Sequence, residues 1–192
     1  MSFSLNSYAK LTFISLSLSL TACQTLQPIQ PTIHSQEQVE NFAIQGKIGI
    51  RTPEQTNSAF YTWIQQNEQY SIELSGILGI GLTQINGDAQ QVSLTNAQVG
   101  TITAPTAEEL LKQATGWIAP ISNLKFWIQA QARHASAQVQ YDTQQRPTII
   151  VEDDWQVELD YNDLNTKPYR LILTQTIENN KQNRITMIIQ NR

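Results

Sequence analysis

The sequence has few of the residues from which most metal and redox sites are built. Its 192 residues include one cysteine and two histidines. A single cysteine excludes an internal disulfide, a CxxC redox pair and a zinc site made of cysteines. The two histidines, His34 and His134, leave little material for a metal site or a catalytic triad. Because G-x-S-x-G, H-E-x-x-H, P-loop and EF-hand motifs are also missing, we expect no catalytic activity, no metal and no cofactor.

Positive charge and long apolar stretches are scarce as well. The chain carries 12 Lys and Arg against 16 Asp and Glu, a formal net charge of -4. Nucleic-acid binding requires clustered basic residues, so we expect no nucleic-acid partner. A multi-span membrane protein is excluded because repeated apolar stretches of about 20 residues are missing. The length fits one domain, or two small ones at most.

The N-terminal segment is predicted to be a lipoprotein signal peptide. Lys10 precedes a short apolar stretch, residues 11–20, which has the proportions of a signal-peptide core. The sequence Leu20-Thr21-Ala22-Cys23 follows it and resembles the bacterial lipobox, whose cysteine becomes acylated when the signal is cut. We therefore expect a signal peptide over residues 1–22 and lipidation of Cys23. The alternative is that Cys23 is a buried free thiol.

The residues after the lipobox predict where the protein resides. Residues 23–40 are polar and rich in Gln, and we expect them to be an acylated N-terminus and flexible tether. In the lipoprotein sorting rule an Asp after the cysteine retains the protein in the inner membrane, whereas this chain has Gln24. Several acyl chains together give a stable anchor. The predicted location is therefore the periplasmic face of the cell outer membrane.

From residue 41 to residue 192 the pattern predicts one mainly β domain. Apolar and polar residues alternate with a period of two, as in half-buried strands, and Asn- and Gln-rich punctuation suits antiparallel hairpins. About ten or eleven strands of this kind predict one strongly curved sheet or a barrel. The expected strands cover residues 42–51, 59–63, 70–74, 80–82, 92–94, 97–103, 137–141, 148–152, 155–161, 169–173 and 185–189, with a turn at 86–88.

Two short helices are expected in the middle of the strands. Thr106 and Glu109 form a capping box at the start of the first helix, and Gly116 is a C-cap candidate. The second helix is expected to open at Ser122 and to place Leu124 and Trp127 on one face. Such an amphipathic pair must bury its apolar face against the sheet. The result is either a solid core or a lidded cavity, and periodicity does not separate the two.

Two loops carry unusual residues. The connection from Ser75 to Gly81 places Ile77 and Leu78 between glycines, where hairpins usually carry polar residues. Either both side chains pack under the sheet edge, or they form an exposed finger that inserts into a bilayer or a partner. The acidic run 152–154 lacks EF-hand spacing and predicts a solvated turn. His134 has no acid or nucleophile placed beside it by sequence, so we expect no catalytic role for it.

Several segments, taken in order, resemble one family. They are the lipobox, Phe42-x-Ile44-x-Gly46-Lys47-Ile48, Ala59-x-Tyr61-x-Trp63, Tyr70-x-Ile72-x-Leu74 with Leu78-Gly79, Gly116-Trp117, Pro120-x-x-x-Leu124-x-x-Trp127-Ile128 and Trp155-x-Val157. Their order and spacing resemble the LolB family of outer-membrane lipoprotein receptors. Ile77 stands where that family often has Pro, and Ala130 where it often has Gly.

The resemblance implies a fold and a function. Members have an unclosed antiparallel β-barrel with a short helical lid, LolA/LolB-like, around an apolar cavity for acyl chains. They are monomeric and not enzymes. They accept acylated lipoproteins from the periplasmic carrier LolA and insert them among the lipids of the outer membrane.

The resemblance also implies site residues. Ile77 and Leu78 would form the membrane-insertion loop. The acyl-chain cavity would be lined by Ala59, Tyr61, Trp63, Tyr70, Ile72, Leu74, Leu110, Leu111, Leu124, Trp127, Ile128, Trp155 and Val157. Two other classes stay open: a structural or assembly lipoprotein that uses the sheet as a protein-binding module with a filled core, and a lipid-active hydrolase.

Overall fold

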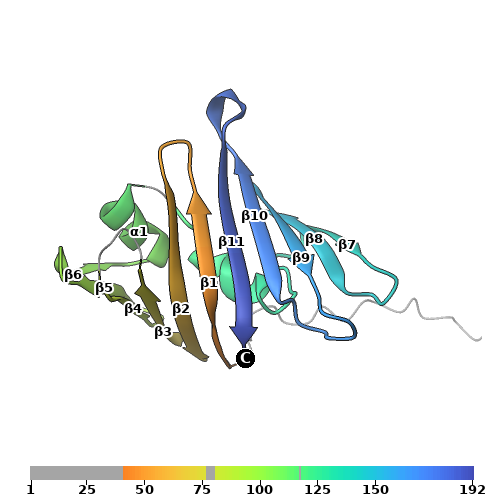
Figure 1. Ribbon diagram of the computed structural model, residues 1–192, viewed down its shortest axis with the longest axis horizontal. Coiled ribbons are helices and arrows are strands. Elements are labelled where there is room, and N and C mark those ends of the chain that lie inside the picture. The colour runs from red at the N-terminus through yellow and green to blue at the C-terminus, as the bar shows by residue number, and fades with distance from the viewer. Residues whose placement is uncertain (1–40, 77–80, 117) are drawn as a thin grey trace, which may run out of the picture. The chain divides into compact units, whose positions relative to one another are not determined.

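The fold is an antiparallel sheet of eleven strands with two short α-helices (Figure 1). The computed structural model describes residues 41–76, 81–116 and 118–192. The strands are β1 (Phe42–Arg51), β2 (Thr56–Gln66), β3 (Gln69–Ser75), β4 (Thr83–Gly87), β5 (Val92–Asn96), β6 (Gly100–Ala104), β7 (Gln138–Tyr141), β8 (Pro147–Glu152), β9 (Trp155–Asp160), β10 (Arg170–Thr176) and β11 (Gln182–Asn191). The helices are α1 (Ala107–Thr115) and α2 (Ile121–Trp127), and a 3₁₀ turn, η2 (Glu178–Asn180), joins the last two strands. The predicted mainly β fold is confirmed.

The sheet order brings the first and last strands together. The order is β6-β5-β4-β3-β2-β1-β11-β10-β9-β8-β7, so β1 pairs with β11 in the middle of the sheet. Two runs of sequential hairpins extend from this central pair to the edge strands β6 and β7. Within the described residues the sheet is therefore open at both edges, as expected for an unclosed barrel.

One face of the sheet is buried and the other is exposed. On β2, Tyr61 and Trp63 are buried while the adjacent Phe60 and Ile64 are exposed. In Figure 1 α1 lies next to the strands β5 and β6, and side chains of α1 and α2 share one hydrophobic core with the buried face of the sheet. Because side chains alternate along a strand, a register slip of one residue would turn this whole set to solvent.

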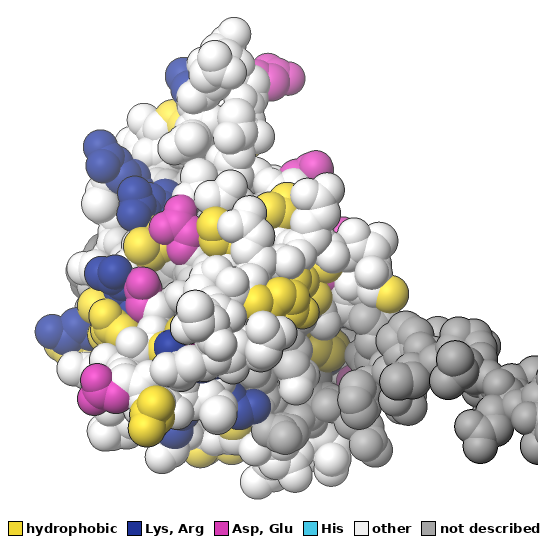
Figure 2. All heavy atoms as spheres, turned by 90° about the vertical axis from the view of Figure 1, so that its right-hand side faces the viewer, with side chains coloured by type: hydrophobic (Ala, Val, Ile, Leu, Met, Phe, Trp, Pro, Cys, Tyr) yellow, Lys and Arg dark blue, Asp and Glu magenta, His cyan; other side chains and the backbone are white. Residues whose placement is uncertain are grey.

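The face turned away from the helices carries basic side chains on the central strands. Lys47 and Arg51 lie on this face of β1, Arg170 on β10 and Arg184 on β11. Figure 2 shows Lys and Arg side chains gathered along one margin of the molecule. The Lys47 ammonium lies 5.1 Å from the ring centre of Phe60, a cation–π distance that partly covers this exposed ring.

Both helices end on local signals. At α1, the Thr106 side chain accepts a hydrogen bond from Glu109 N at 3.2 Å, and Gly116 closes the helix with φ 80°. These two predicted caps are confirmed. The helix α2 begins at Ile121, one residue before the expected start. After it, Ala130 has φ 61°, a left-handed conformation that favours glycine, the residue often found at this position in the family that the sequence resembles.

Three predicted boundaries differ from the structure, and side-chain hydrogen bonds explain two of the differences. The expected turn at 86–88 instead starts at Asp88, whose Oδ1 accepts from Gln90 N and Gln91 N. The expected strand at 97–103 begins only at residue 100, because Asn96 Oδ1 accepts from the backbone N–H groups of residues 98 and 99. Asp and Asn side chains here bind donors that a β-ladder would otherwise use. Of the strand predicted at 80–82, residue 80 lies outside the described residues, and residues 81 and 82 precede β4, which starts at Thr83.

Candidate functional site

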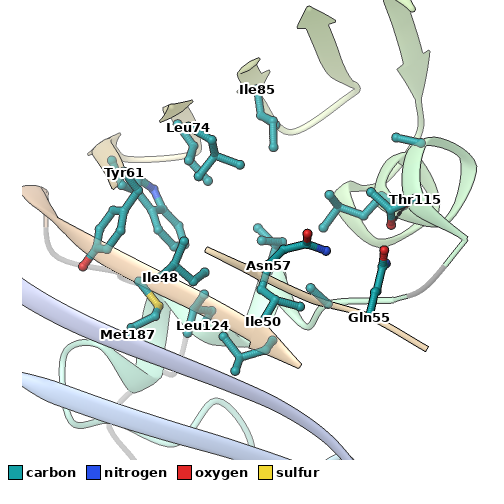
Figure 3. A pocket seen from close by; sticks show the side chains of 17 residues that line it. Ile48, Ile50, Gln55, Asn57, Tyr61, Leu74, Ile85, Thr115, Leu124 and Met187 are labelled. Atoms are coloured by element: carbon teal, nitrogen blue, oxygen red, sulfur yellow. Dashed lines mark hydrogen bonds between the residues drawn. The ribbon is translucent and has the colours of Figure 1, made fainter. Parts of the chain in front are cut away.

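An apolar cavity lies between the buried face of the sheet and the two helices (Figure 3). Its volume is about 230 Å³. The wall is formed by side chains of β1, β2, β3, β4 and β11 on one side and of α1 and α2 on the other. An apolar cavity of about 150 Å³ has room for benzene, so by proportion this volume corresponds to a hydrocarbon segment of roughly nine carbon atoms.

Trp63 provides the largest flat surface of the wall. The residue is 2% exposed, and its ring lies 5.6 Å from the Phe42 ring and 6.4 Å from the Tyr70 ring, centre to centre. Its Nε1 donates to Gln65 Oε1 at 3.2 Å, and the Gln65 amide donates in turn to Asn67 O at 2.6 Å. The indole N–H of Trp63 thus has a hydrogen-bond acceptor inside the protein, so the apolar ring face can line the cavity without leaving a polar group unpaired.

Tyr61 places a hydroxyl near this wall without adding charge. Its OH donates to Ile188 O on β11 at 3.4 Å. Burial raises the pKa of the Tyr61 hydroxyl well above its ordinary value, although the positive charge of Arg192 lowers it in part. The phenol is therefore neutral at physiological pH, and the cavity wall stays uncharged at this position.

A buried glutamate attaches α2 to the sheet. Glu152 Oε2 accepts from Trp127 Nε1 at 2.7 Å and from Arg133 N at 3.1 Å, while Oε1 accepts from His134 N at 2.5 Å. Next to it, Asp153 Oδ2 accepts from the Asn123 amide at 2.7 Å. These bonds connect the ends of α2 and the following loop to the β8–β9 turn, and thereby hold Leu124 of α2 in the cavity wall.

This arrangement corrects two expectations. The acidic run was expected to be a solvated turn, which holds for Asp153 and Asp154, both exposed with positive φ, but is wrong for Glu152, whose side chain is 2% exposed. His134 has acids beside it after all, because its Nδ1 lies 3.3 Å from Glu152 Oε1 and 3.6 Å from Asp153 Oδ2. The fold places the loop after α2 against the β8–β9 turn, a proximity that sequence spacing does not reveal.

Neither a metal cluster nor a membrane-spanning helix is found in the part of the chain that the structure describes. No group of three or more His, Cys, Asp or Glu side chains there is placed to hold a metal ion. No helix among the same residues is long and apolar enough to cross a membrane.

The comparisons with known proteins agree with the resemblance seen in the sequence. The family model described as "Outer membrane lipoprotein LolB" matches residues 40–191. The chain belongs to the LolB family. Among its relatives, the outer-membrane lipoprotein LolB of Pseudomonas fluorescens is 36% identical over 129 residues, 66% of this chain and 63% of that protein.

Further relatives have the same description. The LolB protein of Francisella tularensis subsp. tularensis is 36% identical over 124 residues, which are 60% of either chain. The alignments thus span about three fifths of the relatives' length. Among solved structures, a LolA superfamily protein from Nitrosomonas europaea aligns with a TM-score of 0.47 and 12% identity, covering 80% of this chain and 87% of that one.

The structure divides the residues predicted for the LolB-type cavity into two groups. The wall contains Tyr61, Trp63, Ile72, Leu74, Leu111 and Leu124. The others lie outside the wall: Ala59, Leu110, Trp127, Ile128, Trp155 and Val157 are buried in the protein interior, and Tyr70 packs against Trp63 from outside the cavity. Cys23, Ile77 and Leu78 lie outside the described residues.

Several wall residues were missed by the sequence reasoning. On the strands these are Ile48, Ile50, Asn57, Ile85, Ile185 and Met187, and elsewhere Gln55, Ala114, Thr115, Ala119 and Ile121. Their alternation with polar residues assigns most of the strand members to the buried face. That pattern was available in the sequence, but it does not show which part of the buried face the helices leave uncovered.

Proposed function

We propose that this protein is a lipid-anchored receptor on the periplasmic face of the outer membrane, which accepts acylated lipoproteins from the carrier LolA and inserts them into that membrane. The observation that carries the proposal is the apolar cavity under the two helices, in a chain of the LolB family. Acyl chains are the part of a lipoprotein that requires such an environment. The direct test is transfer of carrier-bound lipoprotein to the purified protein in the absence of nucleotide.

Apolar contact supplies the driving force for such transfer. Each buried CH₂ contributes about 0.8 kcal/mol, so roughly nine buried carbons contribute about 7 kcal/mol before the cost of ordering the chain. Two additional methylenes in contact shift an exchange between carrier and receptor by about tenfold. A load of several chains exceeds about 230 Å³, so only part of such a load fits inside this cavity.

The cavity favours the receptor over a structural module with a filled core. Native interiors contain few voids larger than a water molecule. A space of about 230 Å³ lined by Trp63, Leu74 and Leu124 is much larger than that and lowers packing stability. A protein that used only the outer face of the sheet would gain from filling it.

Filling the cavity is expected to abolish ligand uptake without unfolding the protein. Ala114 of α1 is half-buried and lines the cavity. In Ala114→Trp the indole occupies the space meant for the chain, so we expect at least about tenfold weaker binding of a fluorescent fatty-acid analogue, equivalent to about 1.4 kcal/mol. Ala43→Trp, on the exposed face of β1, is the control and should bind normally. Unchanged affinity in a folded Ala114→Trp variant would place the ligand elsewhere.

We also propose that Cys23 is the acylation site, with residues 1–22 as the signal peptide and residues 23–40 as the tether. The support is the lipobox-like sequence that ends in the only cysteine of the chain. Cys23→Ala is expected to remove palmitate labelling and to leave the precursor unprocessed. Normal labelling of this variant would refute the assignment.

Finally, we propose that Ile77 and Leu78 form the membrane-insertion loop of the receptor. The support is their position between glycines in the connection from β3 to β4. Leu78→Glu replaces an apolar side chain by a carboxylate, which is costly to transfer into lipid. Cargo transfer from the carrier should persist while incorporation into liposomes fails. A clearly lowered thermal midpoint would instead identify Leu78 as a core residue.

A further inference from the structure

The cavity wall has a polar section at one end. Its lining is almost entirely aliphatic and aromatic, yet Gln55 and Asn57 contribute carboxamides to it. Figure 3 shows these two side chains on the same side of the cavity, with Thr115 of α1 next to Gln55 and with Tyr61 and Met187 at the other side. We refer to Gln55 and Asn57 as the amide rim.

The backbone holds both side chains of the amide rim in place. Gln55 lies in the β1–β2 turn, where Thr52 N donates to Gln55 O at 2.9 Å and Gln55 N donates to the Thr52 hydroxyl at 3.2 Å. Asn57 lies on β2, paired with Ile50, and has the same orientation as Tyr61 and Trp63. Both side chains are half-buried, and among the described residues neither carboxamide is bound to a protein partner.

Half-buried amides beside an apolar cavity indicate a ligand with a polar end. A polar group withdrawn from water costs free energy unless it finds a hydrogen-bond partner. An acyl chain in ester linkage is apolar along its length and has one strong acceptor, the carbonyl oxygen, at its head. A primary amide offers two N–H donors, which match such an acceptor.

We propose that the amide rim binds the ester carbonyls at the head of an acyl chain whose methylenes occupy the cavity. This inference rests on the proposed function, since it assumes that acyl chains enter this cavity. The rim then fixes how deep the chain goes: methylenes pass inward, while the glyceryl group stays outside. Gln55 and Asn57 therefore select acyl esters over plain hydrocarbon chains.

The test compares two probes that differ only in the carbonyl groups. Dioctanoylglycerol and its dioctyl ether analogue carry chains of similar length, and each is used to displace a fluorescent fatty-acid analogue from the purified protein. The variant is Gln55→Met with Asn57→Leu, which keeps side-chain size and removes both amides. The control is Gln69→Met, an exposed position that does not line the cavity.

We expect the wild type and Gln69→Met to bind the ester about tenfold more tightly than the ether, the effect of one or two hydrogen bonds. The double variant should lose this preference and bind the ether as well as before. Equal binding of ester and ether by the wild type would overturn the amide rim and leave the cavity function intact. Failure of both probes to bind would instead overturn the proposed function.

The source of the esters is determined in a second pair of displacements. A triacylated cysteinyl peptide represents lipoproteins, and a phosphatidylethanolamine with equal chains represents membrane lipid. Displacement by the peptide, weakened in the double variant, supports lipoprotein acyl esters as the rim's ligand. Displacement by the phospholipid alone would overturn that assignment.

Discussion

Gly46→Ala is expected to destabilise the protein by at least about 3 kcal/mol, because the added methyl group has no space. A Cβ atom on Gly46 would lie 1.8 Å from the backbone oxygen of Ile188 and 2.9 Å from its carbonyl carbon. Both atoms belong to the backbone of β11, so no side-chain rotation relieves the contact. The two central strands of the sheet would have to move apart at this point.

The consequence extends beyond one contact. The β1–β11 register shifts between Gln45 and Gly46, so the close approach coincides with an irregularity in the ladder. Ile188 O also accepts the hydrogen bond from Tyr61, which lines the cavity. Separation of β1 from β11 is therefore expected to disturb the cavity wall together with the sheet.

Gly49→Ala on the same strand is the matched control. A Cβ atom there meets no atom within 4 Å, and a strand position gains stability when glycine is replaced by alanine. We expect urea denaturation to show a large loss for Gly46→Ala and a change within about 0.5 kcal/mol, or a small gain, for Gly49→Ala. Equal behaviour of the two variants would contradict the close packing of β1 on β11.

Most of the strands could be predicted from the sequence, because the alternation of apolar and polar residues along a strand is a local property. The alternation at Tyr61 and Trp63 depends only on β2 and identifies its buried face directly. The pairing of β1 with β11 was not accessible, because it joins residues at opposite ends of the domain. Gly46 is a local consequence of that pairing, because the backbone of Ile188 leaves no room for a side chain there. The sequence does not show this reason, since it does not place Ile188 beside Gly46.

The candidate site was accessible only in part. Alternation assigns a side chain to the buried face, but the distance between helix and sheet decides whether it lines a cavity or packs in the core. Leu111 and Leu110 are neighbours on α1, yet the first lines the cavity and the second is 0% exposed in the core. The amide rim was missed because Gln55 lies in a turn, where polar residues are expected.

Glu152→Ala is expected to lose about 3–5 kcal/mol of stability, because the substitution leaves one buried donor and two partly buried donors without their acceptor. Trp127 is 0% exposed, and its Nε1 donates to Glu152 Oε2 at 2.7 Å. The N–H groups of Arg133 and His134 donate to the same carboxyl group. Glu152→Gln keeps one acceptor oxygen and should fall between the wild type and the alanine variant.

Acyl binding should weaken when α2 is held less firmly against the sheet. Leu124 lies one turn before Trp127 and lines the cavity, so loosening of this end of α2 enlarges the cavity and reduces contact with a chain. Glu158→Ala is the control, since this glutamate is exposed on β9 and accepts a hydrogen bond from the Gln156 side chain at 3.4 Å, away from α2. Urea denaturation and binding of the fatty-acid analogue, measured on the same variants, check both effects. If Glu152→Ala kept wild-type stability, the buried carboxyl group would not be what holds α2 against the sheet.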